Sequence, residues 1–288
     1  MNVYIQSIIL GIVEGLTEFL PVSSTAHLRI TEALMKISLD DAYWSMYTIV
    51  IQLGAILALI LLYLSRIVGF IHTFPKGEKG DRNWFTHPIS FTLIAFACTS
   101  APALLLHKFS EENLKHLDRI AWALLIGGII MWIVDAWAAR RAAITTHVEE
   151  MSLPQAIWIG LCQTLSAVFP GTSRSMSTIA AGQLMGMSRP AALEFSFFLS
   201  IPTMTVATLY TLLKSLTGKD ENPIGVHEIT SHQWVILAIG FVVSFIVAYG
   251  AVAWFMGYVR KRGFAPFAMY RIVLGILVLA YALGMIGR

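Results

Sequence analysis

The sequence predicts an all-α integral membrane protein with six transmembrane helices and two re-entrant helix pairs, arranged as an inverted-topology repeat. The composition, six long apolar runs and an internal repeat carry this prediction. Of the 288 residues 57% are hydrophobic and only 13% are charged, which leaves too little polar surface to cover a soluble globule. We treat residues 1–288 as a single membrane domain with repeat halves at 1–145 and 150–288.

Six segments have the length and apolar character of membrane-spanning helices. A helix needs about 20 mostly apolar residues to cross the hydrocarbon core of a bilayer. The six predicted spans are Tyr43 to Leu64, His87 to Leu106, Ala121 to Ala139, Ala191 to Leu213, Val235 to Met256 and Phe267 to Ile286.

Three further features limit the class of protein. The first residues carry no Lys or Arg, and Met1 to Leu20 has no clear cleavage site, so we expect no removed secretory signal. Cys98 and Cys162 both lie inside apolar runs, which argues against a disulfide between loops and against either cysteine as a metal ligand. The net charge of +3 is spread over a largely apolar chain, so we expect no nucleic-acid partner.

Charged loops predict the orientation, because loops that stay in the cytoplasm are enriched in Lys and Arg. The basic loops contain Arg66, Lys76, Lys79 and Arg82; Arg140 and Arg141; and Arg260, Lys261 and Arg262. The loops between them contain Glu111, Glu112 and Asp118, or Asp220, Glu221 and Glu228. Basic and acidic loops alternate as six spans require, although Glu149 and Glu150 partly balance Arg140 and Arg141.

Residues Gln6 to Thr25 and Gln155 to Arg174 form a degenerate repeat without gaps, 149 positions apart. The matching pairs are Gln6 and Gln155, Ile8 and Ile157, Gly11 and Gly160, Leu16 and Leu165, Pro21 and Pro170, and Ser24 and Ser173, with Glu14 opposite Gln163.

Neither repeat segment is a good membrane span. We expect Glu14 and Glu18 to interrupt the apolar run Val3 to Val13, and Pro21 then removes a backbone donor. The second run, Leu153 to Phe169, is broken at Pro170 and Gly171, and a new helix follows to about Met185.

Each half would therefore hold one re-entrant helix pair and three spans. Because three is odd, the second half is inverted, with the first hairpin entering from outside the cytoplasm and the second from the cytoplasm. The alternative, in which Met1 to Leu20 is a seventh span, would place two glutamates in the bilayer at high cost.

The two breaks predict an anion site. A new helix N-terminus exposes unpaired N–H groups and the positive end of the helix dipole, and both attract phosphate. One such end would carry Ser23, Ser24 and Thr25, and the other Thr172, Ser173 and Arg174. The Arg174 guanidinium fits phosphate oxygens in pairs, and an anionic ligand explains an arginine at membrane depth.

The two halves differ at the charged positions, which suggests different roles. At the repeat offset Glu18 and His27 match Ala167 and Met176, while Arg174 matches Thr25.

Two candidate groups therefore lie in the first half. Glu14 and Glu18 are four residues apart and would share a divalent cation; the alternative is that one of them is protonated. Ser24 and His27 are three apart, as a nucleophile and base would be, although such residues in membrane helices more often serve packing.

The motif Glu14-Gly-Leu-Thr-Glu18-Phe-Leu-Pro21-Val-Ser-Ser24-Thr-Ala-His27 and the motif Pro170-Gly-Thr-Ser-Arg174-Ser resemble the two signature segments of the undecaprenyl-diphosphatase family, also called bacitracin-resistance proteins. The similarity extends to Gln52-Leu-Gly-Ala, to Glu194-Phe-Ser-Phe and to the overall length. It implies a phosphatase of the bacterial inner membrane that uses a divalent cation, Mg²⁺ or Ca²⁺. The enzyme would hydrolyse undecaprenyl diphosphate and return the lipid carrier to cell-wall synthesis, with its active site facing the periplasm.

The resemblance also implies roles for single residues. Glu14 and Glu18 would handle metal or protons, Ser24 and His27 would be nucleophile or base, and Ser173 with Arg174 would bind phosphate, with Thr25 and Thr178 less central. The chain has Ala26, Met176 and Ser177 where the family usually has Gly, Gly and Ala, which concerns the packing behind Arg174.

Three alternatives stay open at this point. Ser24 could attack the terminal phosphorus itself, or His27 or Glu18 could activate water. A secondary transporter or flippase for an anionic lipid or solute would also combine inverted repeats with acids at the midplane. The sequence leaves open whether the chain forms a homo-oligomer, and it identifies no site for the polyprenyl tail.

Overall fold

We analysed a computed structural model, which describes residues 2–38, 41–106, 109, 113, 116–217 and 229–285. These residues form helices, and no strand occurs among them; an isolated bridge joins Thr145 and Met187. The chain is therefore an all-α membrane protein, as the sequence predicts. The acidic residues Glu111, Glu112, Asp220, Glu221 and Glu228, and Ile286 at the end of the last predicted span, lie outside the described residues.

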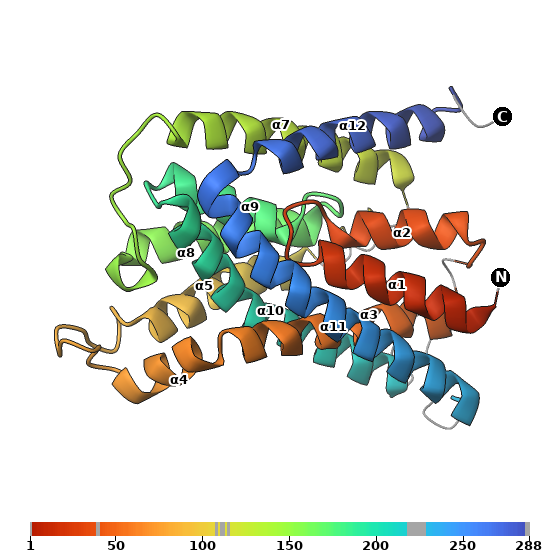
Figure 1. Cartoon of the computed structure of the whole chain (residues 1–288), viewed down its shortest axis with the longest axis horizontal. Helices are drawn as coiled ribbons and strands as arrows, with labels where there is room; N and C mark the ends of the chain where they lie inside the picture. The colour runs from red at the N-terminus through yellow and green to blue at the C-terminus, as the bar shows by residue number, and fades with distance from the viewer. Residues whose placement is uncertain are drawn as a thin grey trace. The chain divides into compact units, whose positions relative to one another are not determined.

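The six predicted spans are confirmed as helices that are long and apolar enough to cross a membrane. They are α3 (Ala42–Leu62), α5 (Pro88–Leu105), α7 (Leu117–Ala138), α10 (Arg189–Leu216), α11 (Ser231–Arg262) and α12 (Ala265–Ala282). Figure 1 shows them with the shorter helices between them. The remaining helices are α1 (Val3–Thr17), α2 (Ser24–Leu34), α4 (Leu64–Thr73), α8 (Leu153–Val168) and α9 (Arg174–Leu184), with a 3₁₀ turn at Val148–Glu150.

Helix α1 contains the apolar run together with Glu14 and ends at Thr17, with Glu18 as its C-cap. One expectation about local structure was wrong. Arg66 does not lie in a loop but on α4, a helix of 10 residues that the sequence analysis missed.

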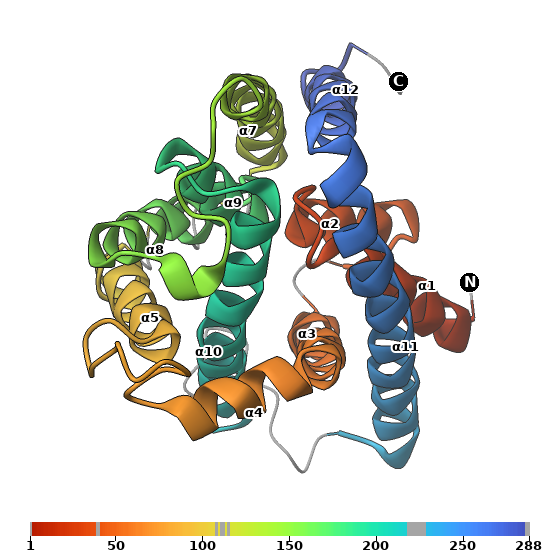
Figure 2. The ribbon, with the colours of Figure 1, turned by 60° about the vertical axis from the view of Figure 1, so that its left-hand side comes forward.

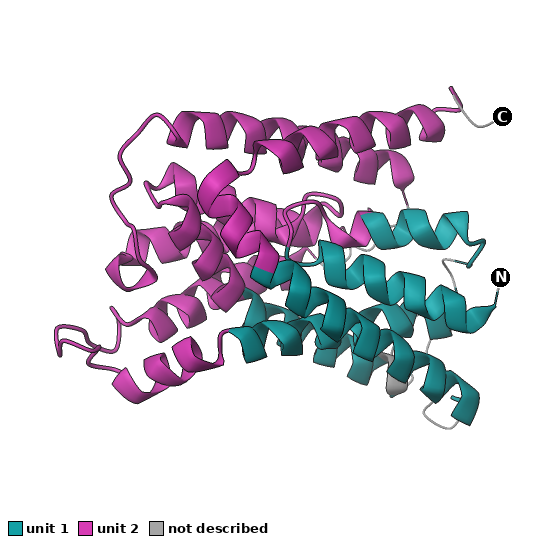
Figure 3. Cartoon of the chain, viewed as in Figure 1, with its two compact units in different colours: residues 1–19, 27–62, 200–253 teal, residues 20–26, 63–199, 254–288 magenta. Residues whose placement is uncertain are grey.

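The chain divides into two compact units, coloured separately in Figure 3. Unit 1 comprises residues 1–19, 27–62 and 200–253, and unit 2 comprises residues 20–26, 63–199 and 254–288. Each unit draws segments from both sequence halves, so the proposed repeat halves are a description of the sequence and not of these units.

Unit 1 packs α1 against α3 and the first part of α11. The Ser7 hydroxyl donates to the Ile236 carbonyl at 2.8 Å and lies 2.9 Å from the Tyr47 hydroxyl, so a buried polar contact links all three helices. Gly11 brings α1 close to α11, since a side chain there would lie 2.8 Å from the Gly240 carbonyl oxygen. Around these contacts the core is apolar, with Leu10, Leu28, Met46, Ile51 and Leu237 among its buried residues.

Unit 2 contains two helix pairs, α7 with α12 and α5 with α8, and α9 packs against both α7 and α8. The pairing of α7 with α12 is visible in Figure 1 and that of α5 with α8 in Figure 2. At Gly160 a side chain would lie 2.4 Å from the Ala95 carbonyl oxygen, so α8 and α5 approach at backbone distance. The repeat-matched glycines Gly11 and Gly160 thus serve the same purpose, close helix contact, in different units.

Candidate functional site

The first helix break lies between α1 and α2. Pro21 cannot donate a backbone hydrogen bond, so the helix does not continue past this point. Ser23 has a left-handed backbone with φ 75°, and its hydroxyl accepts a hydrogen bond from the Ala26 N–H at 3.4 Å. Ser23 is therefore the N-cap, and α2 begins at Ser24.

The second break, between α8 and α9, has the same construction. Gly171 has φ 100°, and a side chain there would lie 2.6 Å from the Ile120 carbonyl oxygen, so glycine is required on both counts. Ser173 has φ 73° and caps α9 by accepting from the Met176 N–H at 3.3 Å. Helix α9 then begins at Arg174.

The two N-caps correct the alignment of the repeat after the break. Ser23 and Ser173 are 150 positions apart, whereas the prolines and the glycines upstream are 149 apart. The matches of Ser24 with Ser173, of Thr25 with Arg174 and of His27 with Met176 are therefore wrong by one residue. In the structure Ser24 and Arg174 each open a helix, and His27 corresponds to Ser177, because the turn before α2 holds one residue fewer than an ungapped repeat requires.

A direct hydrogen bond joins the two breaks within unit 2. The buried Ser175 hydroxyl donates to the Leu20 carbonyl at 2.9 Å and lies 3.1 Å from the Ser173 hydroxyl. A residue of the first turn of α9 is thus bonded to the turn that precedes α2. The predicted meeting of two helix N-termini is supported by this contact.

Arg271 of α12 makes a second connection, which the sequence analysis missed. Its side chain is fully buried and donates to the carbonyl of Pro21 at 3.1 Å. It also donates to the carbonyls of Gly171 at 3.0 Å, Thr172 at 2.8 Å and Ala123 at 3.3 Å. No carboxylate pairs with Arg271 among the described residues. The positive charge of Arg271 therefore lies against the backbone carbonyls of both breaks.

The predicted anion-binding residues of unit 2 fall into two groups. Ser24, Thr25, Thr172 and Arg174 are half-buried, so their side chains remain accessible from one side. Ser23, Ser173 and Thr178 are buried, and the first two act as N-caps.

Thr178 and Arg174 both contact Ser196 of α10. The Thr178 hydroxyl lies 2.7 Å from the Ser196 hydroxyl, and Arg174 donates to the Ser196 carbonyl at 3.4 Å. Ser196 was not identified from the sequence. It anchors the first turns of α9 to α10.

Glu14, Glu18 and His27 belong to unit 1. Glu14 is fully buried and Glu18 is 9% exposed, at the C-terminal end of α1. His27 is half-buried on α2, three residues after Ser24. In the described part of the chain no group of three or more His, Cys, Asp or Glu side chains forms a metal-binding cluster.

Two buried carboxylates at this spacing fit a divalent cation only if further ligands come from elsewhere. Mg²⁺ is commonly held by one or two carboxylates together with substrate phosphate oxygens and water. Glu14 and Glu18 are suited to that kind of site and not to a cage made by the protein alone.

A family model described as bacitracin resistance protein BacA matches residues 7–277. The chain belongs to this family. It is 62% identical over 285 residues to the undecaprenyl-diphosphatase of Koribacter versatilis, covering 98% of this chain and 99% of that protein.

Two more distant members carry the same name. The undecaprenyl-diphosphatase of Lactobacillus delbrueckii is 42% identical, covering 95% of both chains. That of Caldanaerobacter subterraneus is 39% identical, covering 97% of this chain and 96% of the other. The similarity thus extends over essentially the whole sequence and includes both breaks.

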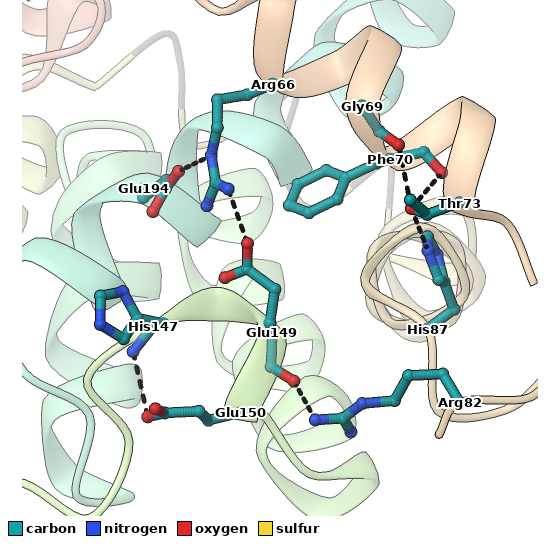
Figure 4. Close-up of polar contacts among 10 residues, drawn as sticks. All are labelled: Arg66, Gly69, Phe70, Thr73, Arg82, His87, His147, Glu149, Glu150 and Glu194. Atoms are coloured by element: carbon teal, nitrogen blue, oxygen red, sulfur yellow. Dashed lines mark hydrogen bonds and ion pairs between the residues drawn. The ribbon is translucent and has the colours of Figure 1, made fainter. Parts of the chain in front are cut away.

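A second polar cluster joins Arg66 of α4, Glu149 of the 3₁₀ turn and Glu194 of α10 (Figure 4). Arg66 lies between two carboxylates, donating to Glu149 at 2.6 Å and to Glu194 at 2.9 Å. Arg82 donates to the Glu149 carbonyl, and His87 lies 3.3 Å from the Thr73 hydroxyl. The cluster ties α4, the 3₁₀ turn and α10 together. In the sequence Arg66, Arg82 and Glu149 had served only to predict orientation, and Glu194 only as part of a family motif.

Proposed function

We propose that the chain hydrolyses undecaprenyl diphosphate to undecaprenyl phosphate and inorganic phosphate, which recycles the lipid carrier for cell-wall synthesis. Membership of the family and the shared name of relatives up to 62% identical support the activity. The observation that carries it is the contact between the two helix breaks, in which Ser175 in the first turn of α9 donates to the Leu20 carbonyl of the turn before α2.

The electrostatics of this pair suit a diphosphate. Each helix start presents unpaired N–H groups and the positive end of a dipole, so two of them at one place attract several negative charges. Arg174 adds a charged donor at the opening of α9, while Arg271 adds charge from behind. Ser24, Thr25 and Thr172 supply accessible hydroxyls, and Ser173 contributes at the N-cap. Ser23 caps α2, and Thr178 holds α9 against Ser196 of α10.

The chemical step is assigned to α2. Ser24 opens this helix and His27 is three residues further along it. We propose that the imidazole accepts a proton from the serine hydroxyl or from a water. In one version Ser24 attacks the terminal phosphorus, the bond between the two phosphates breaks and releases undecaprenyl phosphate, and water then hydrolyses the phosphoserine to free inorganic phosphate. In the other, His27 or Glu18 activates water and Ser24 orients the phosphate. Arg174 stabilises the charge that develops on the phosphoryl group in both versions.

A divalent cation, Mg²⁺ or Ca²⁺, is proposed at Glu14 and Glu18. When bound it would neutralise part of the diphosphate charge, and the two buried carboxylates would lose their mutual repulsion. Chelation with EDTA is expected to abolish phosphate release, and added Mg²⁺ or Ca²⁺ is expected to restore it. Activity that survives exhaustive chelation would contradict a metal requirement.

The six apolar helices make the chain a multi-pass membrane protein, and its partners are the bilayer and a polyprenyl diphosphate lipid. We assign it to the bacterial inner membrane, with the basic loops in the cytoplasm and the active site facing the periplasm. The alternation of basic and acidic loops supports this orientation.

Phosphate release in detergent tests the proposal. Purified protein is expected to release phosphate from undecaprenyl diphosphate, and Arg174→Ala is expected to reduce the rate at least about 100-fold, as loss of a group that stabilises transition-state charge does. Movement of the headgroup across a vesicle membrane without phosphate release would instead indicate a transporter or flippase. A trapped phosphoserine at Ser24 would support the covalent version, and a fully active Ser24→Ala would exclude it.

A further inference from the structure

Unit 2 contains an apolar groove of about 700 Å³ beside the second helix break. Helix α7 forms one wall with Trp122, Ile126 and Ile130, while α8 and the residue after it form the other with Leu165 and Phe169. Helix α9 contributes the small side chains of Ser177, Ala180 and Ala181, together with the larger ones of Met176 and Leu184.

We propose that this groove binds the first part of the polyprenyl tail of the substrate, an inference that rests on the proposed function. The groove continues directly into the candidate anion site, because Thr172 lines it and Ser177 lies in the first turns of α9. If the diphosphate binds at the N-terminus of α9, the attached isoprenoid chain would lie along the side of the same helix.

The groove has the polarity of an amphiphile-binding site. Its lining is mostly aliphatic and aromatic, and the polar members lie near the break. They are Thr172, Ser177, Asn113, which donates to the Val168 carbonyl at 2.9 Å, and Arg119, which donates to Asn113 at 2.7 Å. Trp122, Leu165 and Phe169 are each about half exposed, at 50%, 49% and 45%. Isoprene units bury apolar carbon against such side chains favourably.

The size of the groove limits how much of the tail it holds. Pockets of about 300–1,000 Å³ enclose ligands of drug size, so a volume of about 700 Å³ accommodates only the isoprene units nearest the diphosphate. The rest of a long tail would stay in the bilayer. Affinity should therefore rise with chain length over the first few isoprene units and then level off.

Two tryptophan substitutions on α7 test the groove. Ile126 and Ile130 line it and are 50% and 45% exposed, so a larger side chain can be added without opening the core. Ile126→Trp and Ile130→Trp are expected to raise KM for undecaprenyl diphosphate about tenfold, which corresponds to about 1.4 kcal/mol. Hydrolysis of isopentenyl diphosphate, which carries the same headgroup on one isoprene unit, is expected to be unchanged.

Ile129→Trp and Ile133→Trp are the matched controls. Both residues lie on the same helix with 41% and 62% exposure and do not line the groove. They are expected to leave KM for both substrates unchanged. Equal effects of groove and control variants, or a KM unaffected by Ile126→Trp and Ile130→Trp, would overturn the proposal.

A cross-linking experiment keeps the groove testable without hydrolysis. A polyprenyl diphosphate with a diazirine in its second isoprene unit is expected to label peptides of α7 and of α8 near Leu165, and the Ile126→Trp variant is expected to lose this labelling. Labelling only of other helices would overturn the tail site even if phosphate is released. Labelling of the groove without phosphate release would contradict the proposed hydrolase activity and still support the groove as a binding site for the tail.

Discussion

Arg271 satisfies four backbone carbonyls from three different segments, and two of those segments are the helix breaks. Each carbonyl at a break has lost its helical partner and would cost free energy if it were buried without a donor. One side chain therefore stabilises the two turns on which the proposed anion site depends. Gly127 of α7 provides the room, because a side chain there would lie 2.3 Å from a terminal guanidinium nitrogen.

Gly127→Ala is expected to displace the Arg271 guanidinium from the carbonyls of Pro21 and Thr172. The substitution should lower the free energy of unfolding by about 1–3 kcal/mol, as overpacking of a buried site does, and should reduce phosphate release. Thermal unfolding in detergent and the phosphatase assay measure the two effects. Gly257→Ala is the control, because nothing lies within 4 Å of a side chain at Gly257; equal melting temperatures for both variants would contradict this role of Gly127.

Arg271 also shows what could have been predicted at this scale. It lies as a lone cation inside the apolar run Phe267 to Ile286, which is costly in a bilayer and marks a residue with a specific partner. The sequence therefore indicated that Arg271 has a specific partner. It could not indicate which one, because every residue has a backbone carbonyl. The hydroxyl of Ser175 was equally unremarkable until the structure placed it 2.9 Å from the Leu20 carbonyl.

At the scale of elements, the two helix breaks were predictable and their register was not. Pro21 and Pro170 cannot donate within a helix, which predicts a break near each. The position at which the next helix restarts depends on the turn, and here both turns end in a serine with a left-handed backbone, Ser23 and Ser173. A serine does not favour that conformation over others, so the one-residue shift in the repeat could not be seen in the sequence.

The left-handed N-cap predicts an unusual order of stability. Ser173→Ala loses the cap and keeps the unfavourable φ of 73°, so the variant should be less stable by about 1 kcal/mol. Ser173→Gly also loses the hydroxyl but gains the residue that tolerates this conformation best, and should be more stable than the alanine variant by about 1 kcal/mol. Melting temperatures in detergent measure the order, and an alanine variant as stable as the glycine variant would contradict it.

The same pair of variants separates stability from binding. If the Ser173 hydroxyl binds phosphate, Ser173→Gly should lose most phosphatase activity despite its retained stability. A stable and fully active glycine variant would limit Ser173 to its capping role.

The cluster around Arg66 predicts a pH dependence. Burial alone would raise the pKa of Glu149, but the hydrogen bond and charge of Arg66 lower it below its ordinary value. A carboxylate whose pKa is lowered by folding stabilises the protein above its ordinary pKa, and this contribution is lost as the pH falls through the lowered value. Because Glu149 is partly exposed, the effect should be small.

Arg66→Gln should therefore lower the melting temperature at pH 7 and reduce the loss of stability that begins as the pH falls below about 5 and continues through the lowered pKa of Glu149. Thermal scans across this range test it, with Lys79→Gln as the control for removal of a cation from the same region. A variant with the pH profile of the wild type would show that the pair with Glu149 contributes nothing measurable.

At the scale of the whole molecule, the spans could be predicted because the lipid bilayer limits which structures can cross it. A bilayer requires long apolar helices with internally satisfied backbones, and all six predicted spans occur as helices. The amphipathic helix α4 was missed because a helix of 10 residues beside a span carries no such length signal. Orientation depends on the charges of the loops and remains a prediction.

Single cysteines can determine that orientation. In a Cys98→Ala, Cys162→Ala background, Lys79→Cys lies in a basic loop and Asp118→Cys in the first turn of α7, at the end of an acidic segment. A membrane-impermeant maleimide is expected to label Asp118→Cys in intact spheroplasts and Lys79→Cys only after lysis, because Lys and Arg are retained in the cytoplasm. The reverse pattern would place the basic loops outside, and the proposed periplasmic active site would then have to face the cytoplasm.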